Sequence, residues 1–143
     1  MSAAFEFVEG ATSDLAFVAR GPSLEALFAA AGDALLAATV EDPSLLATRD
    51  ERAVDLEEPD VELLLLRFLN ELVWLRDAKG LLLRVSGIHV EAGPPARLSA
   101  TLVGEPLSPH RHALATDVKG ATAHGLRIEE GPEGFVAHVT LDV

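Results

Sequence analysis

Two stretches of the chain carry hydrophobic residues at the spacing of an amphipathic helix. The first follows Gly21-Pro22, where Ser23 can cap a helix and Glu25 stands in the first turn, which favours an acid. The pattern continues to about Val40, before Asp42-Pro43. The residues expected to form its buried stripe are Leu24, Leu27, Phe28, Ala31, Leu35 and Ala38.

The second stretch predicts a longer helix that begins at Pro59-Asp60 and ends between Asp77 and Gly80. Asp60 is placed to cap its first turn, and Gly80 can adopt the left-handed conformation that commonly ends a helix. Its apolar positions are Val61, Leu64, Leu65, Phe68, Leu69, Leu72 and Leu75. One continuous face of this length is better explained as protein core than as a groove for a partner.

Alternating apolar and polar positions predict strands over most of the remaining chain. They cover residues 4–8, 15–20, 48–57, 81–91, 96–103, 116–123, 126–130 and 135–143, and an irregular loop is expected over 104–109. Strands, helix, strand, helix and a final run of strands are typical of an α+β protein. We therefore expect a single two-layer domain over residues 1–143, in which two helices cover a largely antiparallel or mixed sheet.

Composition narrows the classes of function. A chain of 143 residues suits one domain, and the absence of cysteine excludes disulfides, thiol chemistry and cysteine-ligated zinc. Apolar runs such as 63–66 and 81–83 are far shorter than the roughly 18 residues that span a membrane. Residues 1–7 contain no basic residue and include Glu6, unlike a secretory signal. We expect a cytoplasmic protein without membrane contact.

The formal net charge of −12 argues against direct nucleic-acid binding, because lysine and arginine supply affinity for phosphate backbones. Lys79 and Lys119 are the two lysines, and the arginines are scattered without a cluster. An acidic surface instead suits a cation or a basic protein partner.

Two aspartates stand at strand ends. Asp14 opens the strand predicted over 15–20, and Asp142 closes the last strand on the face opposite its apolar residues. If the two strands are antiparallel neighbours, the carboxylates meet at one end of a sheet, where their repulsion favours a cation. Carboxylates suit Ca²⁺ or Mg²⁺, and the terminal carboxylate of Val143 could supply a further oxygen. From the residues alone, solvated surface acids are the commoner explanation.

Other candidate residues are weaker. His110 and His112 could ligate a transition metal, but no third ligand lies near them in the sequence, and a polar loop is the commoner explanation. His124 precedes Gly125 at a predicted turn, where a hydrogen-bonded structural histidine is at least as common as a functional one. No nucleophile elbow and no glycine-rich phosphate loop occur in the sequence.

Several short motifs together resemble the archease family, small acidic proteins that activate RtcB-type RNA ligases. The matching pieces are Thr12-Ser13-Asp14, Ser23-Leu24-Glu25-Ala26-Leu27-Phe28, Leu69-Asn70-Glu71-Leu72, Gly104-Glu105-Pro106-Leu107, Asp117-Val118-Lys119-Gly120-Ala121-Thr122-Ala123-His124-Gly125-Leu126 and Leu141-Asp142-Val143. Two departures stand out: Gly10-Ala11 after Glu9 replaces the family's histidine and adds one residue, and Ala123 replaces an aromatic residue.

The resemblance implies an accessory protein that promotes guanylylation of the ligase and repeated turnover in tRNA splicing or RNA repair. It implies metal ligands at Asp14 and Asp142 and, less firmly, at Asp117, and it leaves the role of Lys119 open between partner contact and protection of a strand edge. A small metal-dependent hydrolase using the same carboxylates and a chaperone-like binding module are the alternatives.

Overall fold

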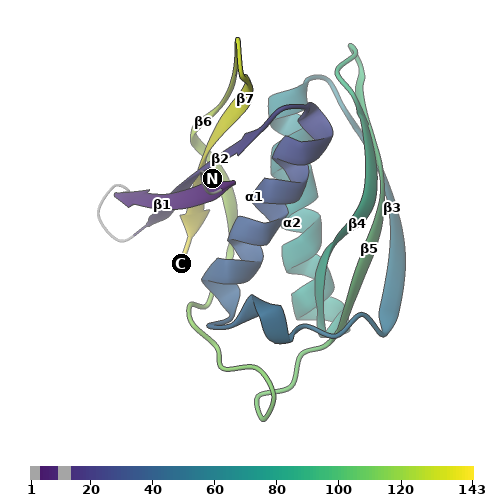
Figure 1. The fold of residues 1–143 in the computed structure, drawn as a ribbon, viewed down its shortest axis with the longest axis vertical. Coiled ribbons are helices and arrows are strands. Elements are labelled where there is room, and N and C mark those ends of the chain that lie inside the picture. Colours follow the sequence, from purple (N-terminus) through teal and green to yellow (C-terminus); the bar gives the residue numbers. More distant parts are fainter. Residues whose placement is uncertain (1–3, 10–13) are drawn as a thin grey trace.

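Two helices stand between two antiparallel sheets in the computed structural model, which describes residues 4–9 and 14–143 (Figure 1). The helices are α1 (Leu24–Thr39) and α2 (Val61–Lys79), and a short 3-10 turn covers Pro43–Leu45. The strands are β1 (Phe5–Glu9), β2 (Leu15–Gly21), β3 (Asp50–Glu58), β4 (Leu81–Glu91), β5 (Ala96–Pro106), β6 (Gly120–Gly131) and β7 (Gly134–Asp142).

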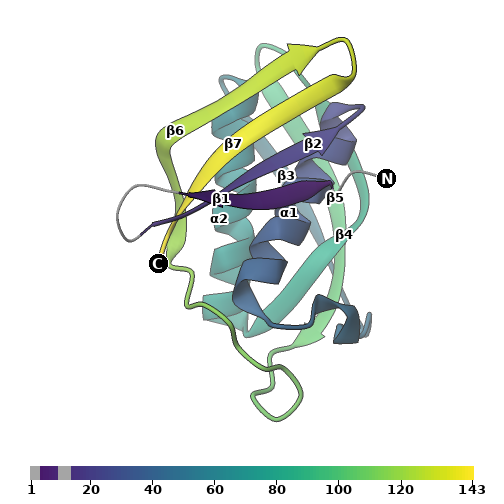
Figure 2. The same cartoon turned by 60° about the vertical axis from the view of Figure 1, so that its left-hand side comes forward.

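The strands are divided between a four-stranded sheet of order β1-β2-β7-β6 and a three-stranded sheet of order β3-β5-β4. Figure 2 shows the first sheet with β1 at one edge and β6 at the other. Every pairing between neighbouring strands is antiparallel. The last strand of the chain therefore lies inside the first sheet, between β2 and β6.

The expected α+β class is confirmed, but the layers differ from the expectation of helices over one sheet. The physical reason is that α1 is apolar on more than one side: ten of its sixteen residues are buried, including Ala30, Gly32 and Ala34 outside the predicted stripe. A helix buried on two sides needs protein on both. The second sheet supplies the additional cover.

The helix ends are those expected from the sequence. Ser23 Oγ accepts a hydrogen bond from the Ala26 N–H at 3.1 Å, and Asp60 Oδ1 accepts one from the Leu63 N–H at 2.9 Å. Gly80 ends α2 with φ at 68°, the left-handed conformation that glycine adopts without a steric penalty.

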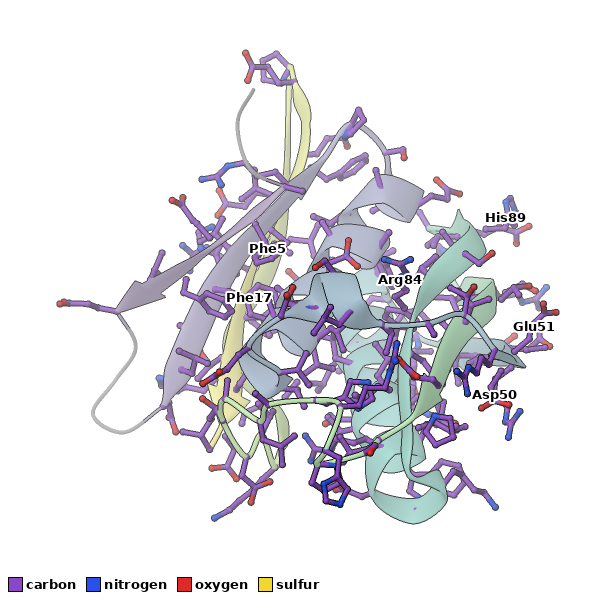
Figure 3. All side chains as sticks on the ribbon, turned by 60° about the horizontal axis from the view of Figure 1, so that its bottom comes forward. Phe5, Phe17, Asp50, Glu51, Arg84 and His89 are labelled. Atoms are coloured by element: carbon purple, nitrogen blue, oxygen red, sulfur yellow. The ribbon has the colours of Figure 1, made fainter. Side chains whose placement is uncertain are left out.

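The core fills the space between the helices and the sheets. Phe28 of α1 and Phe68 of α2 are fully buried, with ring centroids 5.9 Å apart. Phe17 of β2 faces them from the first sheet and is also fully buried, on the side of the sheet that faces α1 (Figure 3). The apolar face of α2 is thus core, as expected.

Each helix is also tied to a sheet edge by a glutamate in its first turn. Glu25 Oε2 accepts the Val90 N–H of β4 at 2.9 Å, and this hydrogen bond lowers the pKa of Glu25. Glu62 Oε2 accepts the Ile128 N–H of β6 at 2.8 Å. These bonds link α1 to the three-stranded sheet and α2 to the four-stranded sheet.

Two segments differ from their predicted boundaries. β5 continues to Pro106, because residues 104–106 pair with the first residues of β4 where a loop was expected. Of the two strands predicted over 116–123 and 126–130, residues 116–119 lie outside any strand, and the rest form one strand, β6, whose register with β7 shifts between Thr122 and Arg127. Gly125, with φ at 68°, lies in this irregularity.

Among the described helices, none is long and apolar enough to cross a membrane.

Candidate functional site

The two aspartates expected as metal ligands lie at the same end of the first sheet. β2 and β7 pair with Leu15 opposite Leu141, and continuing this register by one residue places Asp14 opposite Asp142. Asp142 is exposed and Asp14 is half-buried. The carboxylates thus come from the paired ends of two neighbouring strands, and the C-terminus lies beside this end in both ribbon views (Figures 1 and 2).

A third strand joins the same end. Gly120 of β6 lies opposite Asp142, and the Lys119 N–H donates to the Asp142 carbonyl oxygen at 2.7 Å. The Lys119 side chain is exposed, while Val143 is half-buried and packs against the core. The terminal residue is therefore held next to Asp142.

Asp117 belongs to the same segment, but its carboxylate has a contact of its own. Asp117 Oδ1 lies 3.9 Å from Arg76 Nη2, and the aspartate side chain is 86% exposed. Arg76 is itself nearly buried, pairs with Asp77 at 2.8 Å and donates a hydrogen bond to the Val118 carbonyl oxygen. Asp117 is consequently a weaker candidate ligand than Asp14 and Asp142.

Asn70 of α2 positions the start of β6 beside the aspartate pair. Its Nδ2 donates to the Ala121 carbonyl oxygen at 3.1 Å, and its Oδ1 accepts the Ala121 N–H at 2.9 Å. Gly120 fits against this amide, because a Cβ there would lie 3.0 Å from Asn70 Oδ1. Asn70 belongs to the motif Leu69-Asn70-Glu71-Leu72, and a single amide side chain on a leucine-rich helix is the feature of the sequence that points to this structural role.

The donors at this end fit a hard divalent cation that keeps much of its water. Two carboxylates facing each other favour Ca²⁺ or Mg²⁺, and carbonyl groups and water would complete the shell. No group of three or more histidine, cysteine, aspartate or glutamate side chains gathers within residues 4–9 and 14–143. The described side chains therefore offer two candidate carboxylate ligands and no larger cluster.

A separate polar cluster lies under the loop after β5. Glu105 is buried and accepts hydrogen bonds from the Ala47 N–H at 2.7 Å and from His112 Nε2 at 3.1 Å. Arg111 Nε lies 3.0 Å from Glu105 Oε1. The Ala47 N–H, more than either side chain, lowers the pKa of Glu105 from 4.5 to about 2.

His112 is a structural residue of this cluster. Its Nδ1 accepts the Ser108 N–H at 3.0 Å, so the proton shared with Glu105 is on Nε2. Both ring nitrogens are occupied and the ring is buried, which removes His112 from the metal-ligand pair considered with His110.

His124 lies in the irregular part of β6, where its side chain is exposed and its N–H donates to Thr122 Oγ1 at 3.3 Å. Ala123, in place of the expected aromatic residue, is exposed beside it. The altered segment from Gly10 to Ser13 falls outside the described residues.

Comparison with known proteins covers nearly the whole chain. Residues 5–143 match the model of the Archease protein family (MTH1598/TM1083). The protein archease of Pyrococcus abyssi is 33% identical over 134 residues, covering 92% of this chain and 94% of that protein. The protein archease of Thermococcus gammatolerans is 36% identical over 124 residues, covering 86% and 87%.

A solved structure shows the same architecture. The solution structure of Methanobacterium thermoautotrophicum protein 1598 superposes with a TM-score of 0.85 at 28% identity, covering 99% of this chain and all of that one. The motifs, the order of the strands and these matches agree, and this chain belongs to the archease family.

Proposed function

We propose that this chain is a metal-dependent activator of an RtcB-type RNA ligase, acting in the joining of RNA ends in tRNA splicing or RNA repair. Membership of the archease family supports the accessory role. The observation that carries the proposal is the register that sets Asp14 opposite Asp142 at the end of β2 and β7. In this role the chain is not itself a catalyst.

Asp14 and Asp142 are the proposed protein ligands of Ca²⁺ or Mg²⁺. The bound cation would neutralise the two facing carboxylates and hold the ends of β2 and β7 together. Lys119 holds the Asp142 backbone through its N–H, and Asn70 holds the strand beside it. Asp117 and the terminal carboxylate of Val143 are additional candidate ligands.

The proposed partner is the ligase rather than RNA. With 23 acidic against 11 basic residues, the chain repels a phosphate backbone. The same charge attracts a basic protein surface and speeds encounter with it. We place this interaction in the cytoplasm.

The test is a guanylylation assay with the RtcB-type ligase, radiolabelled GTP, Mg²⁺ or Ca²⁺ and limiting amounts of this chain. We expect covalent guanylate on the ligase to rise with the wild-type chain and to stay near the unassisted level with Asp142→Asn. Asp55→Asn is the matched control, because it removes the same charge from an exposed site in β3 of the other sheet.

Equal stimulation of guanylylation by wild type and Asp142→Asn would show that activation does not depend on Asp142 as a metal ligand. No stimulation by the wild-type chain would overturn the activator role. Metal-dependent hydrolysis of a phosphoester by the chain alone would instead support the hydrolase alternative.

A further inference from the structure

The two sheets have four edges, formed by β1 and β6 in the first sheet and by β3 and β4 in the second. An edge strand presents unpaired N–H and C=O groups that can pair with a strand of another chain. Proteins commonly block such edges with charged side chains or with side-chain hydrogen bonds. Three of the four edges carry such features.

The edges of β4 and β6 are occupied by side chains from the helices. Glu25 takes the Val90 N–H of β4, and Glu62 takes the Ile128 N–H of β6. Asn70 binds both backbone groups of Ala121, also in β6. A strand added at either edge would have to displace these bonds.

The edge of β3 is blocked by charge. Six of its nine residues are acidic or basic, and Arg52 Nη1 donates to the Glu51 carbonyl oxygen at 2.9 Å. Dense charge along an edge strand disfavours pairing with another strand.

β1 differs from the other three edges. In the part of the chain that the structure describes, no side chain is bonded to the β1 backbone. The Arg20 N–H donates to the Ala4 carbonyl oxygen at 2.7 Å, so the backbone groups of Ala4 face β2. Since these directions alternate along an antiparallel strand, the backbone groups of Phe5, Phe7 and Glu9 face away from the sheet.

The exposed edge is also apolar. Phe7 is 41% exposed and its neighbour Val8 is 40% exposed, two of the six large hydrophobic residues exposed within the described chain. The Phe7 ring packs edge-on against Phe5 and Phe17, with centroids 5.9 and 6.4 Å away. Phe7 thus extends the aromatic core to the rim, where a further strand would cover it.

The negative charge of β1 indicates which kind of strand can pair with it. β1 carries Glu6 and Glu9, and Glu9 forms no ion pair with a described residue, whereas Glu6 pairs with Arg20 at 2.8 Å. A second copy of the chain would bring another net charge of −12 to this edge, which opposes self-pairing.

We propose that β1 is a docking edge for an extended basic segment of a protein partner, which adds a fifth strand beside β1. The partner's backbone would pair with the outward groups of Phe5, Phe7 and Glu9. Phe7 and Glu9 share one face of β1 and Glu6 lies on the other, so apolar side chains of the segment would cover Phe7 while its lysines or arginines would lie beside Glu6 on the opposite face. This docking requires neither the metal nor the ligase of the proposed function.

The probe is a synthetic, end-blocked peptide of sequence Val-Lys-Val-Lys-Val-Lys-Val, titrated into the ¹⁵N-labelled chain and followed by NMR. We expect shift changes centred on β1 and slower amide exchange at Phe5, Phe7 and Glu9. Phe7→Lys should weaken binding about tenfold or more, because lysine places charge at the edge and removes the apolar cover. The same peptide with alternate amides methylated should not bind, because it cannot pair as a strand.

Trp74→Lys is the matched control: Trp74 of α2 is 50% exposed and the substitution makes the same change of charge. It should leave peptide binding unchanged. Phe7→Thr provides a second variant of high strand propensity should the lysine variant fail to fold. The proposal would be overturned if Phe7→Lys and Trp74→Lys weakened binding equally, or if the shift changes lay away from β1. Absence of peptide binding, or concentration-dependent dimers of the chain without peptide, would overturn it as well.

Discussion

Glu105 and His112 form a buried pair in which His112 Nε2 lies 3.1 Å from Glu105 Oε2. The Ala47 N–H and Arg111 complete the environment of the carboxylate. Through these bonds Glu105, at the end of β5, is tied to the segment before β3 and to the loop after β5. The ionised carboxylate is thus part of the folded structure.

This pair makes stability depend on pH. The folded pKa of Glu105 is lowered from 4.5 to about 2, so its contribution is fully present above the unfolded value and is lost as the pH falls towards the folded one. We expect Glu105→Gln to lower the urea midpoint at pH 7. The difference from wild type should shrink between about pH 4.5 and about pH 2. A difference that stays constant over this range would contradict the role of the charge.

Asn70→Asp tests the support of β6. The substitution replaces the amide donor with a carboxylate that faces the Ala121 carbonyl oxygen, so one hydrogen bond becomes a repulsion. We expect a loss of about 1–3 kcal/mol in the free energy of unfolding, measured by urea denaturation. Glu71→Gln, at the next position of α2, is the control and should cost less than about 0.5 kcal/mol. Equal losses of unfolding free energy in the two variants would contradict the role of Asn70 in supporting β6.

Metal binding should be visible in the melting temperature. A ligand that binds the folded chain alone stabilises it by about 2.7 kcal/mol at a concentration 100 times its Kd. We expect Ca²⁺ or Mg²⁺ to raise the melting temperature of the wild type and not that of Asp142→Ala. An equal shift in both proteins would exclude Asp142 as a ligand.

The terminal carboxylate of Val143 can be tested separately. Adding residues after Val143 moves the carboxylate away from Asp142 and leaves both aspartates in place. If the carboxylate is a ligand, the extended chain should require more metal for the same shift in melting temperature. Unchanged metal affinity would show that Val143 does not participate.

Substitution by alanine should affect stability much more at Gly104 than at Gly87. A Cβ at Gly104 would clash with the Leu82 carbonyl oxygen, so the two strands would have to separate, whereas a Cβ at Gly87 meets nothing within 4 Å. We expect Gly104→Ala to cost about 3 kcal/mol or more and Gly87→Ala to change stability by less than about 1 kcal/mol. The measurement is urea denaturation, and similar costs would contradict the close approach of β4 and β5.

Local signals in the sequence were sufficient for most elements. The caps at Ser23 and Asp60 and the left-handed Gly80 depend on neighbours within one turn, and all three are confirmed. The division into two sheets depends on pairings between residues far apart, such as Leu15 with Leu141. Alternation alone states which side chains share a face and not which strand is the neighbour.

Local sequence patterns predict the candidate site only in part, for the same reason. Strand ends and family motifs point to Asp14 and Asp142 as candidate metal ligands, and the register of β2 with β7 places the two residues opposite each other. The supporting contacts of Asn70 with Ala121 of β6 and of Arg76 with Val118 before β6 cross more than 40 residues of sequence. No local pattern identifies such contacts, because they depend on how α2 lies against the sheet.

The position of β7 has a consequence for synthesis of the protein. β7 lies between β2 and β6, although it is made more than 110 residues after β2. Until residues 134–142 are made, β1 and β2 lack the strand that connects them to β6. The four-stranded sheet can therefore close only once β7 has been made, which makes a chain truncated before β7 a target for chaperones and proteases.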